Sequence, residues 1–255
     1  MMNQMLIKEA KELFKNYKII MLPLIFIGIL LMQPIVLKLL PKLLESSSNL
    51  PAGMVINIGT IGVSDVLGSI LSQFEQLGVI TIILIMMGTI VEERSSGVTA
   101  MVLVKPIGRG LYYFSKLIIY SVLFSISFFI AIGICGYYTD ILYGGVEWGA
   151  LFKGAAIYLP NLLLVVSIVL ILSSFLKKQL AVAVGAFILY NILIIVPKYL
   201  GEFISSISPN SIVDSANKVL SGVSGVEFLK PVICVSMLSL MLILAGCFIF
   251  NKQEI

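Results

Sequence analysis

The sequence predicts an all-α membrane protein with six transmembrane helices, and three observations lead to this prediction. Of the 255 residues, 59% are hydrophobic and only 12% are charged, whereas soluble domains carry about 25% charged residues. The mean hydropathy is +1.10. Six apolar runs are each long enough to cross a hydrocarbon core about 30 Å thick. We expect residues 1–255 to form a single transmembrane domain.

Residues 1–18 are predicted to form an amphipathic helix that lies in the membrane interface. The apolar face is unbroken, which favours this interpretation over an ordinary charged tail. It holds Leu6, Ile7, Ala10, Leu13, Phe14 and Tyr17. The polar face holds Lys8, Glu9, Lys11, Glu12, Lys15 and Lys18.

The six-helix bundle is predicted over residues 19–250. The spans are residues 19 to about 37, 65–91, 112–137, 150–176, 180 to about 196, and 231–250. A longer segment joins the last two spans, and its residues 211–220 are predicted to form a short amphipathic helix. Within the fourth span, Ala150 and Gly154 form a pair of small residues that we interpret as a packing contact. Residues 251–255 form a tail.

The distribution of charge predicts the orientation of the chain. If the amino terminus is cytoplasmic, 11 of the 17 basic residues fall in cytoplasmic segments, and 8 of the 13 acids fall outside. Basic residues favour the cytoplasmic side of a membrane protein. The sequence therefore predicts a multi-pass protein of the cell membrane with both termini in the cytoplasm.

The longest polar interruption lies between the second and third spans, at residues 91–116. Residues 92–104 are predicted to form a short cytoplasmic helix, with Glu92 and Glu93 at its favourable amino end. Lys105 and Pro106 end it, because proline lacks the N–H and restricts the residue before it. A short helix that lies across a membrane face suits docking of a soluble protein.

The segment reads E-E-R-x-x-G, then seven residues, then K-P-I-x-R-x-x-x-x-x-S-K. This pattern resembles the ABC-2 class of transporter permeases, and the order of the spans extends the resemblance over nearly the whole chain. The small hydroxyl residue usual before the arginine is replaced here by Gly108. The positions that match the pattern are Glu92, Glu93, Arg94, Gly97, Pro106, Arg109 and Lys116.

The resemblance implies the membrane subunit of an ABC exporter, which forms the translocation pathway. The short helix would be a coupling helix seated in a groove of a separate ATP-hydrolysing subunit. The implied ATPase-coupling residues are Glu92, Glu93, Arg94, Gly97, Val98, Met101, Pro106 and Arg109. We expect both carboxylates of this segment to be exposed.

The resemblance also implies partners and cofactors. The chain lacks the G-x-x-x-x-G-K-[ST] motif, so we expect it to hold no cofactor, with ATP and Mg on the ATPase subunits. Two nucleotide sites imply a homodimer or a heterodimer with a related permease. Membrane lipid is the other expected partner, and nothing points to a nucleic acid.

Polar residues at membrane depth are candidates for the translocation pathway. They are Gln73, Glu75, Gln76 and Asn191. Gln73 and Gln76 share one helix face, whereas Glu75 lies about 200° from Gln73 and needs a partner on a neighbouring helix. The alternative is that these residues only form hydrogen bonds between helices.

Enzymatic readings have no support, because histidine is absent and Cys135, Cys234 and Cys247 lack metal-ligand spacing. Two other classes remain open. The first is a membrane module that does not transport, such as a sensor or an assembly factor. The second is an ion-coupled secondary carrier, in which Glu75 would be the embedded charge.

Overall fold

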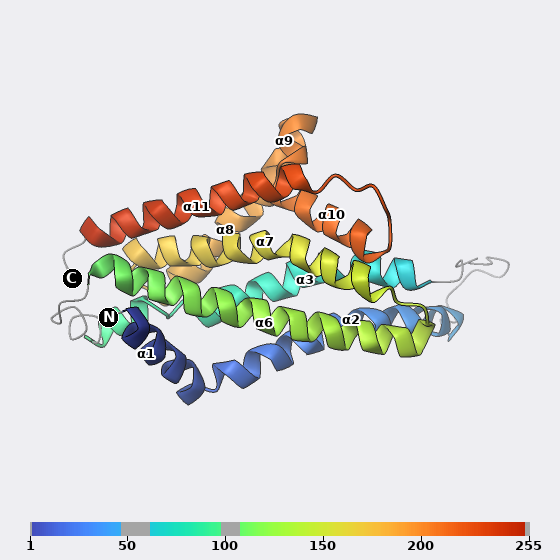
Figure 1. The fold of residues 1–255 in the computed structure, drawn as a ribbon, viewed down its shortest axis with the longest axis horizontal. Coiled ribbons are helices and arrows are strands. Elements are labelled where there is room, and N and C mark those ends of the chain that lie inside the picture. The colour runs from blue at the N-terminus through green and yellow to red at the C-terminus, as the bar shows by residue number, and fades with distance from the viewer. Residues whose placement is uncertain (1, 47–61, 98–107, 253–255) are drawn as a thin grey trace.

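The computed structural model describes residues 2–46, 62–97 and 108–252, and within these residues it contains helices and no strand (Figure 1). Six helices are long and apolar enough to cross a membrane, which confirms the predicted all-α class with six spans. They are α2 (Lys18–Ser46), α3 (Val63–Met86), α6 (Arg109–Tyr143), α7 (Trp148–Phe175), α8 (Gln179–Ile195) and α11 (Leu229–Lys252).

The helices differ from the predicted spans mainly at their ends. Helices α2 and α6 extend beyond their apolar runs, because hydropathy marks only the part of a helix that is apolar. Helix α6 ends where Gly144 adopts φ +72°. The second span, predicted over 65–91, breaks after Met86 and resumes as α4 (Val91–Ser95). The intervening turn contains Gly88 and Thr89, which have low helix propensity.

Helix α7 lies at the centre of the bundle. It packs against α3, α6, α8, α11 and the short α10 (Pro209–Leu220). Its buried side chains surround the helix, as expected for a helix that is hydrophobic on all sides. An aromatic cluster extends this core toward α2, α3 and α6, with ring centroids 4.9 Å apart for Phe26 and Phe74 and 5.0 Å apart for Phe74 and Phe128. Large apolar side chains on α2, α8 and α11 remain exposed, as a lipid-facing surface requires.

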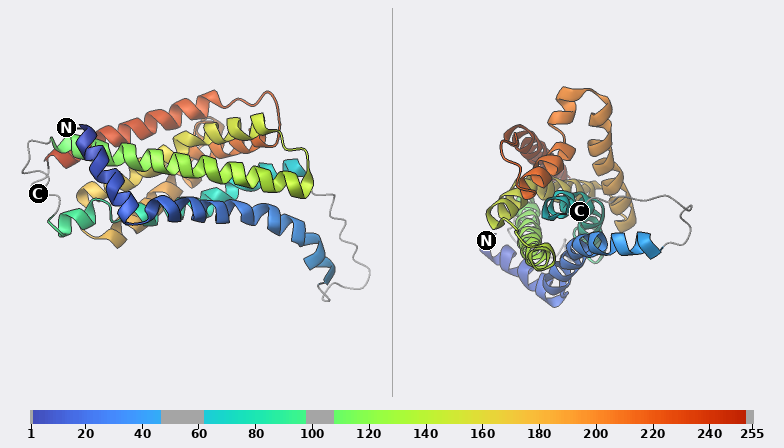
Figure 2. Two further views of the ribbon diagram at one scale, coloured as in Figure 1. Left: turned by 60° about the horizontal axis from the view of Figure 1, so that its bottom comes forward. Right: turned by 90° about the vertical axis from the view of Figure 1, so that its right-hand side faces the viewer.

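Figures 1 and 2 show that α1 (Met2–Lys15), α4 and the last turn of α11 lie at the same end of the bundle. We call this the terminal end. The other short helices are η1 (Val196–Tyr199), α9 (Glu202–Ser206) and α10, which follow α8. Helix α10 covers the predicted residues 211–220 and begins with Pro209 at a favourable position.

The amphipathic helix at the amino terminus is present, but its faces differ from the prediction. Helix α1 packs mainly against α6. It buries the side chains of Met5, Glu9 and Leu13. Ile7 and Phe14, predicted on the same apolar face as Leu13, are exposed. The placement of Glu9 on the solvated face is wrong, because its carboxylate is paired with a lysine of α6. The location of α1 in the membrane interface stays a prediction.

Candidate functional site

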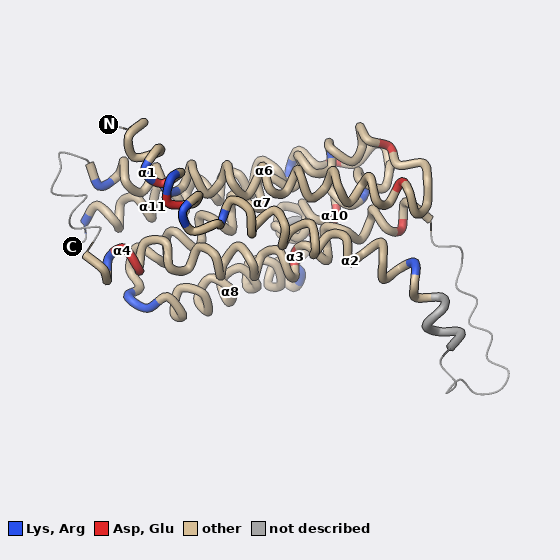
Figure 3. The backbone as a smooth tube through the Cα atoms, turned by 90° about the horizontal axis from the view of Figure 1, so that it is seen from below, with Lys and Arg blue, Asp and Glu red and all other residues tan. Residues whose placement is uncertain are grey.

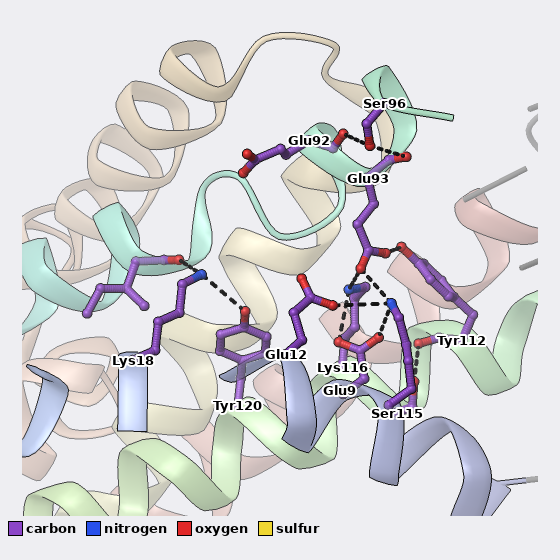
Figure 4. Close-up of polar contacts among 12 residues, drawn as sticks. Glu9, Glu12, Lys18, Glu92, Glu93, Ser96, Tyr112, Ser115, Lys116 and Tyr120 are labelled. Atoms are coloured by element: carbon purple, nitrogen blue, oxygen red, sulfur yellow. Dashed lines mark hydrogen bonds and ion pairs between the residues drawn. The ribbon is translucent and has the colours of Figure 1, made fainter. Parts of the chain in front are cut away.

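Charged residues gather toward the two ends of the bundle, with few between them (Figure 3). At the terminal end, four side chains form a group that we call the ion-pair cluster: Glu9, Glu93 and Lys116, which are buried, and Lys8, which is partly exposed (Figure 4). Lys116 Nζ, on a side chain only 1% exposed, lies 3.0 Å from Glu9 Oε2 and 3.0 Å from Glu93 Oε1. Lys8 Nζ lies 2.7 Å from Glu93 Oε1 and 3.0 Å from Glu9 Oε1. The cluster therefore joins α1, α4 and α6.

A tyrosine connects the ion-pair cluster to a fourth helix. The Tyr112 hydroxyl donates a hydrogen bond to Glu93 Oε2. The Tyr112 ring stacks on Phe250 of α11, with centroids 5.5 Å apart, and Lys116 Nζ lies 5.0 Å from its centroid. Glu93 thus receives two ammonium groups and one hydroxyl, which satisfies a carboxylate removed from water.

The cluster shifts the pKa values of two groups on α1. Burial acts to lower the pKa of Lys8, but the hydrogen bond to Glu93 and the attraction of Glu9 outweigh it, and the pKa is raised above the ordinary 10.5. Burial and the charge of Glu93 raise the pKa of Glu12, and the attraction of Lys116 and Lys8 offsets only part of this effect. Lys8 therefore stays charged in the cluster at neutral pH.

The expectation that Glu93 is exposed is wrong: it is 7% exposed. The reason is that the second residue after Val91 faces α1 and α6, where two lysines compensate its charge. Glu92 is exposed as expected, and within the described part of the chain no hydrogen bond or ion pair is seen for its carboxylate. Adjacent residues on α4 thus have different environments.

The two predicted coupling arginines contact the ends of other helices. Arg94 Nη2 donates to the carbonyl of Ser174, in the last turn of α7, at 2.8 Å. Arg109 Nη1 donates to the carbonyl of Asn251, near the end of α11, at 3.2 Å. Cations are favourable at the carboxyl end of a helix. Gly97 adopts φ +75° after α4, a conformation suited to glycine.

The predicted coupling helix can be followed only in part. Its described portion is the five-residue helix α4. Val98, Met101 and Pro106 lie outside the described residues.

The carboxylate oxygens of Glu9, Glu12 and Glu93 lie within 4.8 Å of one another, a spacing that a metal ion could use. The Lys8 and Lys116 ammonium groups already contact these oxygens. A cation would have to displace them, so the group is an ion-pair cluster and not a metal centre.

The second candidate region surrounds Glu75, which has the partners on neighbouring helices that its position on α3 requires. Tyr158 donates to Glu75 Oε2 at 2.6 Å and Asn161 Nδ2 to the same oxygen at 3.0 Å. Tyr190 donates to Oε1 and accepts from Asn161 Nδ2 at 2.8 Å. The carboxylate therefore joins α3, α7 and α8.

A cavity of about 340 Å³ lies beside this network, between α3, α8, η1 and α10. Glu75, Gln76 and Asn191 line it together with Lys198 and Asp214. Gln73 is not among its lining residues. The structure thus brings three of the four predicted pathway residues together and separates the fourth.

Sequence reasoning missed the role of Lys8, Glu9 and Tyr112. In a helix with alternating lysine and glutamate, nothing distinguishes the one glutamate that is buried. The only available signal was Lys116, a basic residue just inside the third span, where a buried charge needs a partner.

Comparison with known proteins places the chain among membrane transport proteins. Residues 4–255 match a family described as ABC-2 family transporter protein. The uncharacterized transmembrane protein YxlG of Bacillus subtilis (strain 168) is 33% identical over 157 residues, which are 62% of this chain and 61% of that protein. The match therefore spans less than two thirds of this relative.

Proposed function

Because the chain belongs to the ABC-2 transporter family, we propose that it is the membrane subunit of an ABC exporter. In this proposal the chain forms the translocation pathway, and a separate ATP-hydrolysing subunit drives it. ATP and Mg bind to that subunit, and this chain holds no cofactor. The terminal end faces the cytoplasm of a cell, where the ATPase is.

The observation that carries the proposal is the anchoring of α4. Glu92 is exposed at the terminal end, while its neighbour Glu93 is fixed to α1 and α6 through Lys8 and Lys116. Arg94 is bonded to the end of α7. A protein that docks on α4 can therefore displace three other helices, because packed and ion-paired side chains transmit movement.

The cavity between α3 and α8 is the part of the pathway that we assign to this chain. Gln76 and Asn191 supply uncharged polar groups, and the Glu75 carboxylate faces the same space. The three hydrogen bonds to Glu75 hold its carboxylate in position beside the cavity. Gln73 stays a candidate for another part of the pathway, because it does not line this cavity.

The ATPase provides two nucleotide sites at its own dimer interface, so two permease chains are required. We propose two copies of this 27.8 kDa chain, or this chain with a related permease, on two ATPase subunits. The exposed apolar surfaces of α2, α8 and α11 leave room for a second permease as well as lipid.

Purification with a tagged chain tests the proposal. The expected result is a complex with an ATP-hydrolysing protein, whose mass corresponds to two permeases and two ATPases and whose activity rises with substrate. A chain that purifies without an ATPase, or that transports only in response to an ion gradient, contradicts it. The second outcome favours the carrier alternative, with Glu75 as the ion-binding carboxylate.

A further inference from the structure

The cavity between α3 and α8 contains a carboxylate that has no cationic partner within the chain. Three groups donate hydrogen bonds to Glu75, and all three are neutral: the hydroxyls of Tyr158 and Tyr190 and the amide of Asn161. Within the described residues, no lysine or arginine forms an ion pair with Glu75. Glu93, in contrast, contacts two ammonium groups. A carboxylate at membrane depth needs a compensating positive charge or a proton.

One oxygen of the Glu75 carboxylate is turned toward the cavity. Oε2 accepts from Tyr158 and Asn161, which are fully buried and are not among the residues that line the cavity. Oε1 accepts from Tyr190, which does line it. An ionised carboxylate has about four acceptor sites, and the described residues fill three of them. The acceptor site that is left therefore belongs to Oε1, on the cavity side.

Asn191 of α8 provides a second, independent acceptor in the same cavity. Its Nδ2 donates to the carbonyl of Phe187 at 2.8 Å. Because a carbonyl can only accept, the nitrogen of the amide must face its own helix, and Oδ1 is the end left over. No described residue donates to this oxygen. A carboxylate oxygen on α3 and an amide oxygen on α8 thus select a ligand that donates hydrogen bonds.

The remaining lining determines the charge and the body of such a ligand. Glu75 and Asp214 are the acids that line the cavity and Lys198 is the base, so one negative charge is in excess. Asp214 and Lys198 are both exposed, where water screens their charges. The volume of about 340 Å³ suits a small molecule. The apolar part of the lining consists of Val79, Ile80, Phe187, Ile194 and Val213.

We propose that this cavity binds an amphipathic molecule with one primary ammonium group, and that such an amine is the transported substrate. The ammonium N–H groups donate to Glu75 Oε1 and Asn191 Oδ1, and the hydrocarbon body contacts Phe187 and Ile194. This inference rests on the proposed function and names the substrate class. A single ammonium matches the excess of one negative charge, and the apolar lining suits its body and not a hydrated inorganic cation.

Crosslinking with matched probes tests the proposal. The probes share one alkyl chain that carries a diazirine, and their head groups are a primary amine, an alcohol and a carboxylate. They are applied at neutral pH to the full chain in lipid nanodiscs, and mass spectrometry maps the labelled residues. The amine should label Phe187 and Ile194 about tenfold more than the alcohol does, in the range of a hydrogen bond to a charged group. The carboxylate should label them least.

Labelling of α11 corrects for partition of the probes into lipid. Met241 and Leu244 are exposed on the apolar surface of this helix, so the yield at these residues measures the membrane concentration of each probe. Equal labelling of the cavity by the amine and the alcohol, after this correction, overturns the proposal, because it shows that Glu75 holds a proton or is closed to the ligand.

Two substitutions assign the preference to the named oxygens. Glu75→Gln should abolish the preference for the amine, whereas Glu227→Gln, in an exposed ion pair with Lys230, should leave it unchanged. Asn191→Leu should reduce it about two- to tenfold, in the range of one hydrogen bond. Asn191 bonds only to its own helix among the described residues, so this variant decides the matter even if Glu75→Gln does not fold. An unchanged preference in Asn191→Leu overturns the proposal.

Other cations are separate outcomes of the same assay. If sodium or potassium at the concentration of the probe removes the preference, an inorganic cation is the occupant and the proposal is overturned. If the parent chain shows no preference and Lys198→Met creates one, Lys198 itself occupies the site and the proposal is also overturned.

ATP hydrolysis by the purified complex distinguishes a substrate from a bound lipid. The amine should raise the hydrolysis rate of the parent complex, and the alcohol should not. An amine that labels the cavity without raising the rate overturns its assignment as substrate, while the proposed function stands. The crosslinking assay needs no ATPase, so a chain that prefers the amine but purifies alone supports the cavity and overturns the exporter.

Discussion

At the residue scale, Lys116 anchors two polar elements, α1 and α4, to the apolar bundle. Its ammonium group is buried between Glu9 and Glu93. Burial of a charge requires close partners. Here one lysine serves a carboxylate from α1 and a carboxylate from α4, so a single side chain of α6 fixes the position of both elements.

Replacement of this lysine should be severely destabilising. Lys116→Met keeps a similar length but leaves Glu9 and Glu93 to share Lys8 alone. Loss of one partner from a buried ion pair costs about 3–5 kcal/mol. Thermal or denaturant unfolding in detergent measures the effect, with Lys230→Met in an exposed pair as the matched control. Equal stability of the two variants would show that the cluster contributes nothing to folding.

The burial of this cluster was not predictable from sequence alone. The pattern on residues 1–18 assigns Glu9 to the polar face, and Glu92 and Glu93 have the same residue type in adjacent positions. Their difference arises from tertiary contacts with α6, which local periodicity does not contain. In contrast, Glu75 was predicted to need a partner on a neighbouring helix, because a carboxylate at membrane depth must be paired or bonded, and Tyr158, Asn161 and Tyr190 supply the bonds.

At the element scale, the six spans were predictable because each is a long apolar run, and the helix ends were less so. The break between α3 and α4 shows why. The run of apolar residues continues through 87–90, but the backbone turns there. Hydropathy records solubility in lipid and not backbone conformation, so it did not reveal the turn inside the second span, which extends over Val63–Ser95 in the structure.

Helix α3 presents different faces at neighbouring positions, and cysteine labelling can distinguish them. In a chain that lacks its three native cysteines, a cysteine at position 76 should react fastest with a polar maleimide, because Gln76 is exposed and lines the cavity. Positions 73 and 75 should react more slowly, since both are partly buried. A faster reaction at position 73 than at position 76 would contradict the assigned cavity.

The small residue Gly154 allows α7 and α10 to approach each other. A Cβ at this position would lie 2.6 Å from Leu220 Cγ and 2.9 Å from the carbonyl oxygen of Ala216. The predicted packing role of this glycine is therefore fulfilled by a helix of the same chain. Here the sequence pattern identified the type of contact but not the helix that makes it.

Gly154→Ala should accordingly separate α10 from α7. Overpacking of this kind costs about 1–3 kcal/mol. Gly149→Ala is the matched control in the same helix, since a Cβ there meets no atom within 4 Å. The unfolding midpoints of the two variants are compared. An unchanged midpoint for Gly154→Ala would mean that α7 and α10 accommodate the added methyl group without loss of stability.

At the scale of the whole molecule, the arrangement of charge and the arrangement of helices agree. The segments that the charge bias assigns to the cytoplasm include α1, α4 and the end of α11, and these lie at one end of the bundle (Figure 1). The proposed docking function requires this agreement, because an ATPase can reach α4 only from the cytoplasm.

Orientation can be measured directly in intact cells. In a chain without native cysteines, Ser96→Cys lies beside α4 at the terminal end and Ser224→Cys lies in the connection between α10 and α11. Both positions are exposed. The excess of basic residues at the terminal end predicts that it is cytoplasmic. A membrane-impermeant maleimide should therefore label position 224 in intact cells and position 96 only after permeabilisation. Labelling in the opposite order would place α4 outside the cell, where no ATPase could dock on it.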